Sequence, residues 1–335
     1  MSDAPDDARE RASLVTLAVV ARRAGVSVPT VSRVLNARPG VAEATRGRVV
    51  GELERAGYVV GHRRAPRLLD LVIPEVGSLY ESAVVEAVQA AARSRGVSTV
   101  LTTSATGDWL AQVTGRTSGG VIAALHTVVD REVAWSRSTG TPLVLLEPVT
   151  RPPDGVTWVA TDNRGGGRAA AEHLLSRGHR RIAYVSSIGG WPATERRAGV
   201  LGALHDAGLP DPERGGYVVD DVVAPGGVRP ALEALLALPQ PPTAVLASHD
   251  HLALMLLGAA HELGLVVPRD LSVMGFDDVH AAELVVPALT TMRQPLRELA
   301  DAAVERALAP TATASPGAPL ALPVRLVERA SVAPA

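Results

Sequence analysis

The stretch Gly25–Asn36 (GVSVPTVSRVLN) most constrains how this chain can fold. The segment before it, Leu17–Ala24, has apolar side chains spaced for one face of a short helix. Gly25 suits the left-handed conformation that ends such a helix, because it has no Cβ to clash. Ser27 is a good N-cap for a second helix, and Pro29 falls in its first turn, where the missing N–H costs nothing. The pattern predicts a helix-turn-helix.

The second predicted helix has two different faces. The face that we expect to pack against the first helix comprises Val31, Val34 and Leu35. The outward face comprises Thr30, Ser32, Arg33 and Asn36. Short hydrogen-bonding side chains and one long cation on an exposed helix are typical of a recognition helix in the major groove of DNA.

Positive charge is concentrated in the same region of the sequence. From Ser13 to Arg64 there are nine arginines and three glutamates, whereas the whole chain has a formal net charge of −2. Contacts to phosphates need such a concentration of cations. The alternative to a DNA-binding domain is a small helical bundle with a solvated basic face.

The segment Val15–Val60 resembles the headpiece of the LacI/GalR family of bacterial repressors. The shared markers are AGVS, then TVSRVLN, PGV, TR and a closing GY. The resemblance implies that Val28, Pro29 and Arg33 read bases. Val28 and Pro29 suit thymine methyl groups, and Arg33 suits a guanine. The other residues predicted to contact DNA, mainly its backbone, are Leu17, Ser27, Thr30, Ser32, Asn36, Thr45, Tyr58, Arg63 and Arg64.

The length of 335 residues allows a headpiece and a core large enough for two lobes. We expect a disordered tail at 1–12, a helix-turn-helix domain at 13–60, a basic linker at 61–67 and an effector-binding core at 68–335. The linker, GHRRAPR, is too short for the hinge helix of many relatives, so its arginines are expected to follow the minor groove or the phosphates. The chain has no cysteine, no signal-peptide pattern and no apolar stretch near the ~20 residues that span a membrane. A cytoplasmic protein is expected.

In the core, short apolar runs alternate with helical segments, beginning with Leu68–Ile73 and Tyr80–Ser94. This alternation predicts parallel sheets covered on both faces. The expected fold is an all-α helix-turn-helix headpiece followed by an α/β two-lobed core like that of periplasmic binding proteins. Lobe 1 is placed at 68–161 and 291–318, and lobe 2 at 162–290 and 319–331. The chain would cross between lobes near Asp162, near Thr290 and within 310–319.

The core also resembles the LacI/GalR family. The most specific segment is Val267–Pro295, with GFDD and then PALTT and QP, and others are Thr161–Val185 and Leu322–Ser331. The family resemblance implies a small effector between the lobes, usually a sugar or a nucleobase, and no cofactor. No leucine heptad follows the last segment, so a homodimer is expected.

Eight residues are candidates for contacting the effector. Arg196 offers several donors in a rigid fork, and Asp277 is the matching acceptor for hydroxyls. Tyr80 corresponds to a stacking position, and Trp191 is a possible substitute for the family's second aromatic, which is Val222 here. The remaining candidates are Glu147, His249 and Asp250. The alternatives are a structural ion pair for Arg196 and Asp277, packing for Tyr80 and Trp191, and a solvated surface for Glu147. Asp278 is expected to cap or pack.

Signals for an enzyme are weak. The run GGG at 165–167 lacks the lysine of a phosphate loop, and the adjacent residues of SHDH (248–251) cannot face one another as a catalytic triad. No metal site is predicted. The sequence therefore predicts a sequence-specific, effector-controlled repressor that binds a pseudo-palindromic DNA operator. The alternatives are a solute-binding protein, an enzyme with its site in the cleft, and a regulator that has lost effector sensing.

Overall fold

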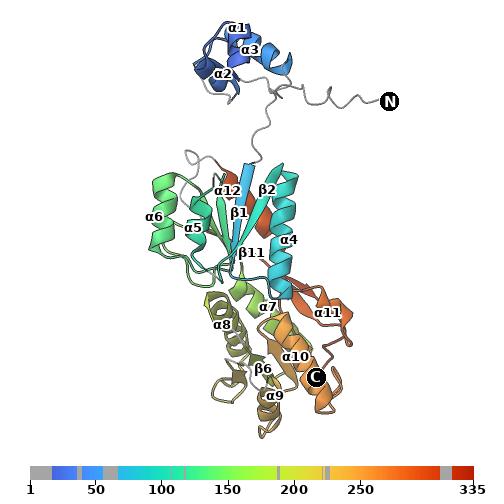
Figure 1. The fold of residues 1–335 in the computed structure, drawn as a ribbon. Coiled ribbons are helices and arrows are strands. Elements are labelled where there is room, and N and C mark those ends of the chain that lie inside the picture. The colour runs from blue at the N-terminus through green and yellow to red at the C-terminus, as the bar shows by residue number, and fades with distance from the viewer. Residues whose placement is uncertain are drawn as a thin grey trace, which may run out of the picture. The chain divides into compact units, whose positions relative to one another are not determined.

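The structure is a computed structural model that describes residues 17–35, 40–55, 67–105, 107–116, 118–186, 189–220, 222, 227–309 and 319–335. The chain forms two compact units, Met1–Pro66 and Arg67–Ala335, which are drawn in Figure 1. The predicted tail at 1–12 and linker residues 61–66 lie outside the described residues, as do Asn36, Tyr58, Arg63 and Arg64. No helix within the described ranges is long and apolar enough to cross a membrane.

The first unit contains α1 (Leu17–Ala24), α2 (Val28–Leu35) and α3 (Glu43–Arg55). Gly25 has a φ of +66°, so the predicted left-handed end of α1 is confirmed. The hydroxyl of Ser27 accepts the backbone N–H of Thr30 at 3.3 Å, which caps α2 as expected. The core of this unit is made by Val20, Ala21, Ala24, Val31, Val34, Val49 and Leu53. Burying the apolar faces of three short helices against one another is what stabilises each of them.

Lobe 1 of the second unit is built on a six-stranded sheet whose strand pairs are all parallel. Its strands, in spatial order, are β11 (Leu320–Leu322), β5 (Thr157–Thr161), β4 (Leu143–Leu146), β3 (Val121–Ala124), β1 (Arg67–Ile73) and β2 (Val97–Thr103). One face is covered by α4 (Leu79–Ser94) and α12 (Leu296–Leu308), and the other by α5 (Trp109–Thr114) and α6 (Asp130–Thr139). The parallel α/β architecture is as predicted.

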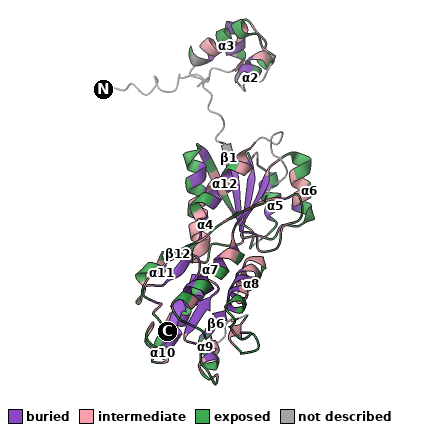
Figure 2. Ribbon diagram, turned by 180° about the vertical axis from the view of Figure 1, so that it is seen from behind, coloured by how far each residue is buried: buried purple, intermediate pink, exposed green. Residues whose placement is uncertain are grey.

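Lobe 2 is built on a four-stranded parallel sheet in the order β7 (Val218–Val219), β6 (Ile182–Val185), β8 (Ala244–Ala247) and β9 (Ser272–Met274). One face is covered by α7 (Asn163–Ser176) and α8 (Trp191–Asp206), and the other by α9 (Arg229–Leu236), α10 (Asp250–Glu262) and α11 (Ala281–Leu284). Figure 2 shows the central strands of both sheets as buried, which explains their continuous apolar runs.

Two of the three predicted crossings between lobes are wrong in position. The strand β10 (Thr291–Arg293), which was assigned to lobe 1, packs Met292 into the core of lobe 2, so the crossing lies at Gln294–Pro295. The strand β11, which was assigned to lobe 2, pairs with β5 of lobe 1. The last crossing therefore follows Leu322 and leads into β12 (Arg325–Val327), which pairs antiparallel with β10. The expected crossing near Asp162 is confirmed, because α7 follows β5 directly.

The strand orders determine where a ligand can enter. In lobe 1, β1 lies between β2 and β3, so the connections that leave the carboxyl ends of β1 and β3 diverge. In lobe 2, β6 lies between β7 and β8 in the same way. Such switch points leave a crevice at the carboxyl ends of the strands, where ligands bind in open α/β sheets.

Glycines bring α7 and α8 into close contact. A Cβ on Gly167 would lie 2.1 Å from the carbonyl oxygen of Arg196, and a Cβ on Gly199 would lie 2.0 Å from that of Arg164. The two backbones therefore touch, and this contact fixes the position of Arg196 relative to α7.

We expect Gly199→Ala to lower the free energy of unfolding of the core by about 1–3 kcal/mol or more, because the new methyl group has no space. Gly202→Ala on the same helix is the matched control, since its Cβ would meet only the flexible end of Arg168, at 3.8 Å. This control should be neutral or stabilising by up to about 1 kcal/mol. Urea denaturation of the two variants measures both values, and equal stabilities would show that α8 can move away from α7.

Candidate functional sites: a recognition helix and an interlobe cavity

The outward face of α2 is available to a partner. Val28 is 42% exposed, and Ser27, Pro29 and Arg33 are also exposed. Thr30, Ser32 and Thr45 are half-buried. Leu17 is half-buried as well and packs against the core of the first unit. The exposed and half-buried residues are those predicted to meet DNA, whereas the buried ones face α1 and α3.

Exposed cations lie on the other two helices of the first unit. Arg22 and Arg23 lie in the last turn of α1, where positive charge complements the helix dipole. Arg48 on α3 is exposed, and Arg55 pairs with Glu52. A short helix with an exposed polar face, in a unit whose other helices carry exposed arginines, has the chemistry that groove and phosphate contacts require.

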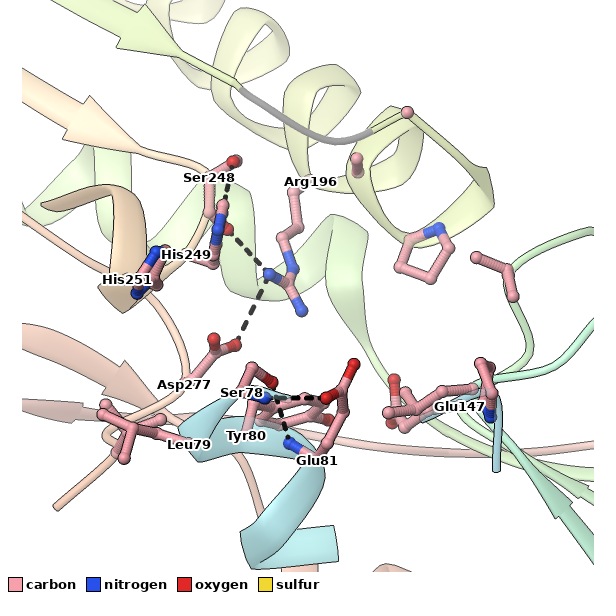
Figure 3. A pocket seen from close by; sticks show the side chains of 17 residues that line it. Ser78, Leu79, Tyr80, Glu81, Glu147, Arg196, Ser248, His249, His251 and Asp277 are labelled. Atoms are coloured by element: carbon pink, nitrogen blue, oxygen red, sulfur yellow. Dashed lines mark hydrogen bonds and ion pairs between the residues drawn. The ribbon is translucent and has the colours of Figure 1, made fainter. Parts of the chain in front are cut away.

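A cavity of about 330 Å³ lies where the carboxyl ends of the two core sheets face each other. Lobe 1 contributes the turn after β1 and the start of α4, with Leu125 after β3 and Glu147 after β4. Lobe 2 contributes Arg196 from α8 and residues that follow β8 and β9. Figure 3 shows these side chains around the cavity. It occupies the switch points of both sheets.

Arg196 is the central cation of this cavity and is only 9% exposed. Its Nε donates to Asn163 Oδ1 at 2.6 Å, and its Nη1 donates to the carbonyl oxygen of Ser248 at 2.7 Å. Nη1 also lies 3.5 Å from Asp277, and the guanidinium carbon lies 3.9 Å from the centre of the Phe276 ring. The remaining nitrogen, Nη2, has no hydrogen-bond partner among the described residues. Figure 3 shows the guanidinium directed from α8 into the cavity.

A chain of hydrogen bonds runs from Asp277 to lobe 1 through Gln294, which lies at the crossing between lobes. The amide nitrogen of Gln294 donates to Asp277 at 2.6 Å. Its amide oxygen accepts the hydroxyl groups of Tyr80 at 2.7 Å and Thr161 at 2.6 Å. Sequence reasoning missed Gln294, although it is the glutamine of the family-like QP pair. These hydrogen bonds link Tyr80 and Thr161 of lobe 1 to Asp277 of lobe 2.

Glu147 is buried, being only 3% exposed, so the solvated-surface alternative is excluded. Its carboxylate accepts the backbone N–H of Thr161 at 2.5 Å. Burial raises the pKa of this carboxyl, while the bond to Thr161 and the charge of Arg196 oppose the shift. Glu147 has a φ of +50°, and Leu125 and Asp277, which also line the cavity, have φ values of +52° and +128°. Backbone strain of this kind gathers at functional sites.

Burial also changes the protonation of the lobe 2 residues. It raises the pKa of Asp277 to about 7, although the charge of Arg196 opposes this shift. Burial and then the charge of Arg196 lower the pKa of His249 to about 4, so this histidine is neutral near pH 7. The cavity therefore holds one permanent cation, Arg196, against carboxyls from both lobes.

Three of the eight predicted effector residues do not line the cavity. Asp250 is fully buried, and its carboxylate accepts the N–H of Val279 at 2.9 Å and the hydroxyl of Thr291 at 2.5 Å, which holds the loop after β9. Val222 packs against the core of lobe 2. Trp191 lines a different cavity. Each faces away from the ligand space because of its place in the packing, which sequence position alone does not reveal.

Five predicted residues do line the cavity, namely Tyr80, Glu147, Arg196, His249 and Asp277. Lining residues that the sequence analysis missed include Ser78, Leu125, Ser248 and His251. Asp278 pairs with Arg293 and Arg329, which agrees with its expected structural role. Within the described ranges, no group of three or more histidine, aspartate or glutamate side chains could hold a metal ion.

Known proteins resemble the chain over most of its length. A family model described as bacterial regulatory proteins, lacI family, matches residues 16–59, and a periplasmic binding protein-like domain matches 171–332. An HTH-type transcriptional regulator from the aml 5' region of Streptomyces limosus is 34% identical, over 86% of each chain. A solved complex of the transcriptional regulator CelR with cellobiose is 31% identical, with a TM-score of 0.68 over 94% of this chain and 99% of that one. The lac repressor dimer bound to operator and the anti-inducer ONPF is 26% identical, with a TM-score of 0.73 over 95% and 99%.

The raised pKa of Asp277 predicts a pH dependence of stability. Its folded value of about 7 exceeds its ordinary value of 3.8, so between these values the folded state binds more protons than the unfolded chain. The contribution of Asp277 to stability should therefore fall as pH rises from about 4 to about 7, whereas His249, with its pKa lowered to about 4, contributes in the opposite direction below its ordinary value of 6.5. Asp277→Asn removes this titration, and we expect the fall to be smaller, with a remainder from Asp250, whose pKa burial raises to about 6.

Urea denaturation at intervals across this pH range measures the slope. The exposed Asp130→Asn variant, in the same unit, is the control and should keep the wild-type slope. A wild-type slope in Asp277→Asn would contradict the assignment.

Proposed function

The chain belongs to the lacI family of bacterial regulatory proteins, and we propose that it represses transcription as a homodimer controlled by a neutral sugar or glycoside. Its relatives are transcriptional regulators and not enzymes. We therefore place this regulator in the bacterial cytoplasm, where its DNA target would lie. The observation that carries the effector proposal is the single cation Arg196, which pairs with Asp277 of lobe 2 in a cavity that is also lined by the buried carboxyl of Glu147 from lobe 1.

The charges of the cavity favour an uncharged, hydroxyl-rich ligand. An anion would meet Glu147 and Asp277, and Arg196 is already engaged by Asp277 and two other acceptors. Hydroxyl groups can donate to the carboxylates and accept from the remaining nitrogen of Arg196. The solved complex of the similar regulator CelR with cellobiose supports this class of ligand.

Such a ligand would act on the relation between the lobes. It would contact Tyr80 and Glu147 in lobe 1 and Arg196 and Asp277 in lobe 2, so its affinity must depend on how closely the lobes approach. The Gln294 chain links the same two walls. A ligand shifts an equilibrium between two arrangements only through this difference in affinity.

We propose that two headpieces read a pseudo-palindromic operator. A homodimer is supported by apolar side chains exposed at and after α11, where Leu284 is 67% and Val286 is 96% exposed. The solved lac repressor to which the chain is similar is a dimer on its operator.

Arg33 provides the test of base reading. An operator is first selected by the wild-type protein from a random DNA library. We expect Arg33→Ala to lose discrimination between this operator and a scrambled duplex by about 1–3 kcal/mol, while most non-specific binding remains. Arg48→Ala, which removes an exposed arginine of α3, should weaken both equally. Fluorescence anisotropy at fixed salt measures the affinities, and an equal loss in Arg33→Ala would assign Arg33 to phosphate contacts.

The effector is tested by a thermal-shift screen against sugars, glycosides and nucleobases. A ligand that stabilises the wild-type protein with increasing dose should also change its affinity for the selected operator. Asp277→Ala should abolish that change while operator binding without ligand is retained. A response that survives in Asp277→Ala would place the pocket elsewhere. A screen without any stabilising compound would favour the alternative, a regulator that has lost effector sensing because of Val222 and His249.

A further inference from the structure

A second interlobe cavity, of about 430 Å³, lies beside the first one. We call it the tryptophan cleft; it is lined by residues 151–156, Trp158, Trp191, Glu195 and Pro319. Trp158 comes from β5 of lobe 1, whereas Trp191 and Glu195 come from the first turns of α8 in lobe 2. The cleft is therefore built by both lobes.

The two lobes touch between the two cavities. The backbone N–H of Trp191 donates to the carbonyl oxygen of Val149 at 2.8 Å. The rings of Trp158 and Trp191 meet edge to face, with centres 5.3 Å apart. Val149 and Pro192 line the first cavity, whereas their neighbours Arg151 and Trp191 line the cleft. One interlobe contact thus separates two cavities that both span the lobes.

The chemistry of the cleft suits a ring with an apolar face and a polar rim. Indole faces carry a negative quadrupole that attracts the C–H groups of such a face. Arg151 and Asp154 are exposed and form no ion pair with any described residue, while Glu195 pairs with Arg164. Charges of both signs can donate to and accept from hydroxyl groups without favouring a net charge on the ligand.

The loop that supplies these charges is restrained. Pro152 and Pro153 fix two successive φ angles, which limits the conformations that the loop can lose when a ligand binds. A volume of this size lies within the range of small-molecule sites.

We propose that the tryptophan cleft binds a neutral carbohydrate ring at a site separate from the effector cavity. A ring packed against the joined Trp158 and Trp191 rings, on the side that lines the cleft, contacts both lobes, so it stabilises the arrangement in which Trp191 bonds to Val149. Because the effector cavity spans the same lobes, occupancy of either site raises affinity at the other. The proposal does not depend on the identity of the effector.

The experiment uses the full chain labelled with 5-fluorotryptophan. The protein has four tryptophans, so its fluorine spectrum has four assignable resonances. Trp109 lies in the core of lobe 1 and Trp135 packs against it, and neither lines the cleft, so both serve as internal references. The probes are glucose, galactose, cellobiose and maltose, and the titrations are made in Asp277→Ala, which disables the effector cavity. We expect saturable shifts of the Trp158 and Trp191 resonances with at least one probe, while the references stay unchanged.

Asp154→Ala, made in the same background, should weaken this binding at least tenfold, whereas Asp130→Ala should leave it unchanged. Absence of any Trp158 or Trp191 shift with all four probes overturns the proposal, and so does an unaltered affinity in Asp154→Ala. Failure of the effector proposal is a different outcome: operator binding would then ignore sugars while the two tryptophan shifts persist.

Discussion

The buried guanidinium of Arg196 is the interaction on which the effector-binding core depends. A buried cation is costly unless acceptors and an opposite charge pair with it, as they do with Nε and Nη1 of Arg196. Here the acceptors come from the start of α7, the end of β8 and the loop after β9. Satisfying one charge therefore fixes the positions of three segments at the carboxyl edge of lobe 2. The glycine contact between α7 and α8 is a condition for this, because it sets where Arg196 leaves its helix.

Asp277 balances this cation only in part, and this imbalance underlies the class of ligand that we propose for the cavity. Its carboxylate lies 3.5 Å from Arg196 and receives a shorter bond from Gln294, while burial raises its pKa to about 7. Glu147, on the opposite lobe, is also buried and also has a raised pKa. Both acceptors are poorly solvated, so a ligand hydroxyl improves their surroundings more than it would improve those of an exposed carboxylate. An anionic ligand would be unfavourable, because it would bring a negative charge close to these two acceptors.

The sequence predicted the features that depend on residues close together in the chain. It missed those that depend on where a strand or a side chain is directed in the folded core. Gly25, Ser27 and the faces of α2 were predictable, because capping and helical spacing act within a few residues. Of the eight residues that the family-like segments predicted to contact an effector, five line the cavity. The strands β10 and β11 were misassigned because three-residue strands have no periodicity to detect. Asp250 follows His249 immediately, yet it turns into the core to hold Val279 and Thr291, which no spacing rule reveals.

The arrangement of the two lobes also determines which cavity each aromatic side chain lines. With Val222 half-buried and packed against the core of lobe 2, the described lining of the effector cavity has only Tyr80 as a large aromatic ring besides two histidines. The hydroxyl of Tyr80 is tied to Gln294, which fixes the ring in the wall. Trp191 cannot take over the missing position, because its backbone bond to Val149 and its contact with Trp158 hold it on the other side of the interlobe contact. For the effector that we propose, recognition in this cavity would therefore depend mainly on hydrogen bonds to Arg196, Asp277 and Glu147, and little on stacking.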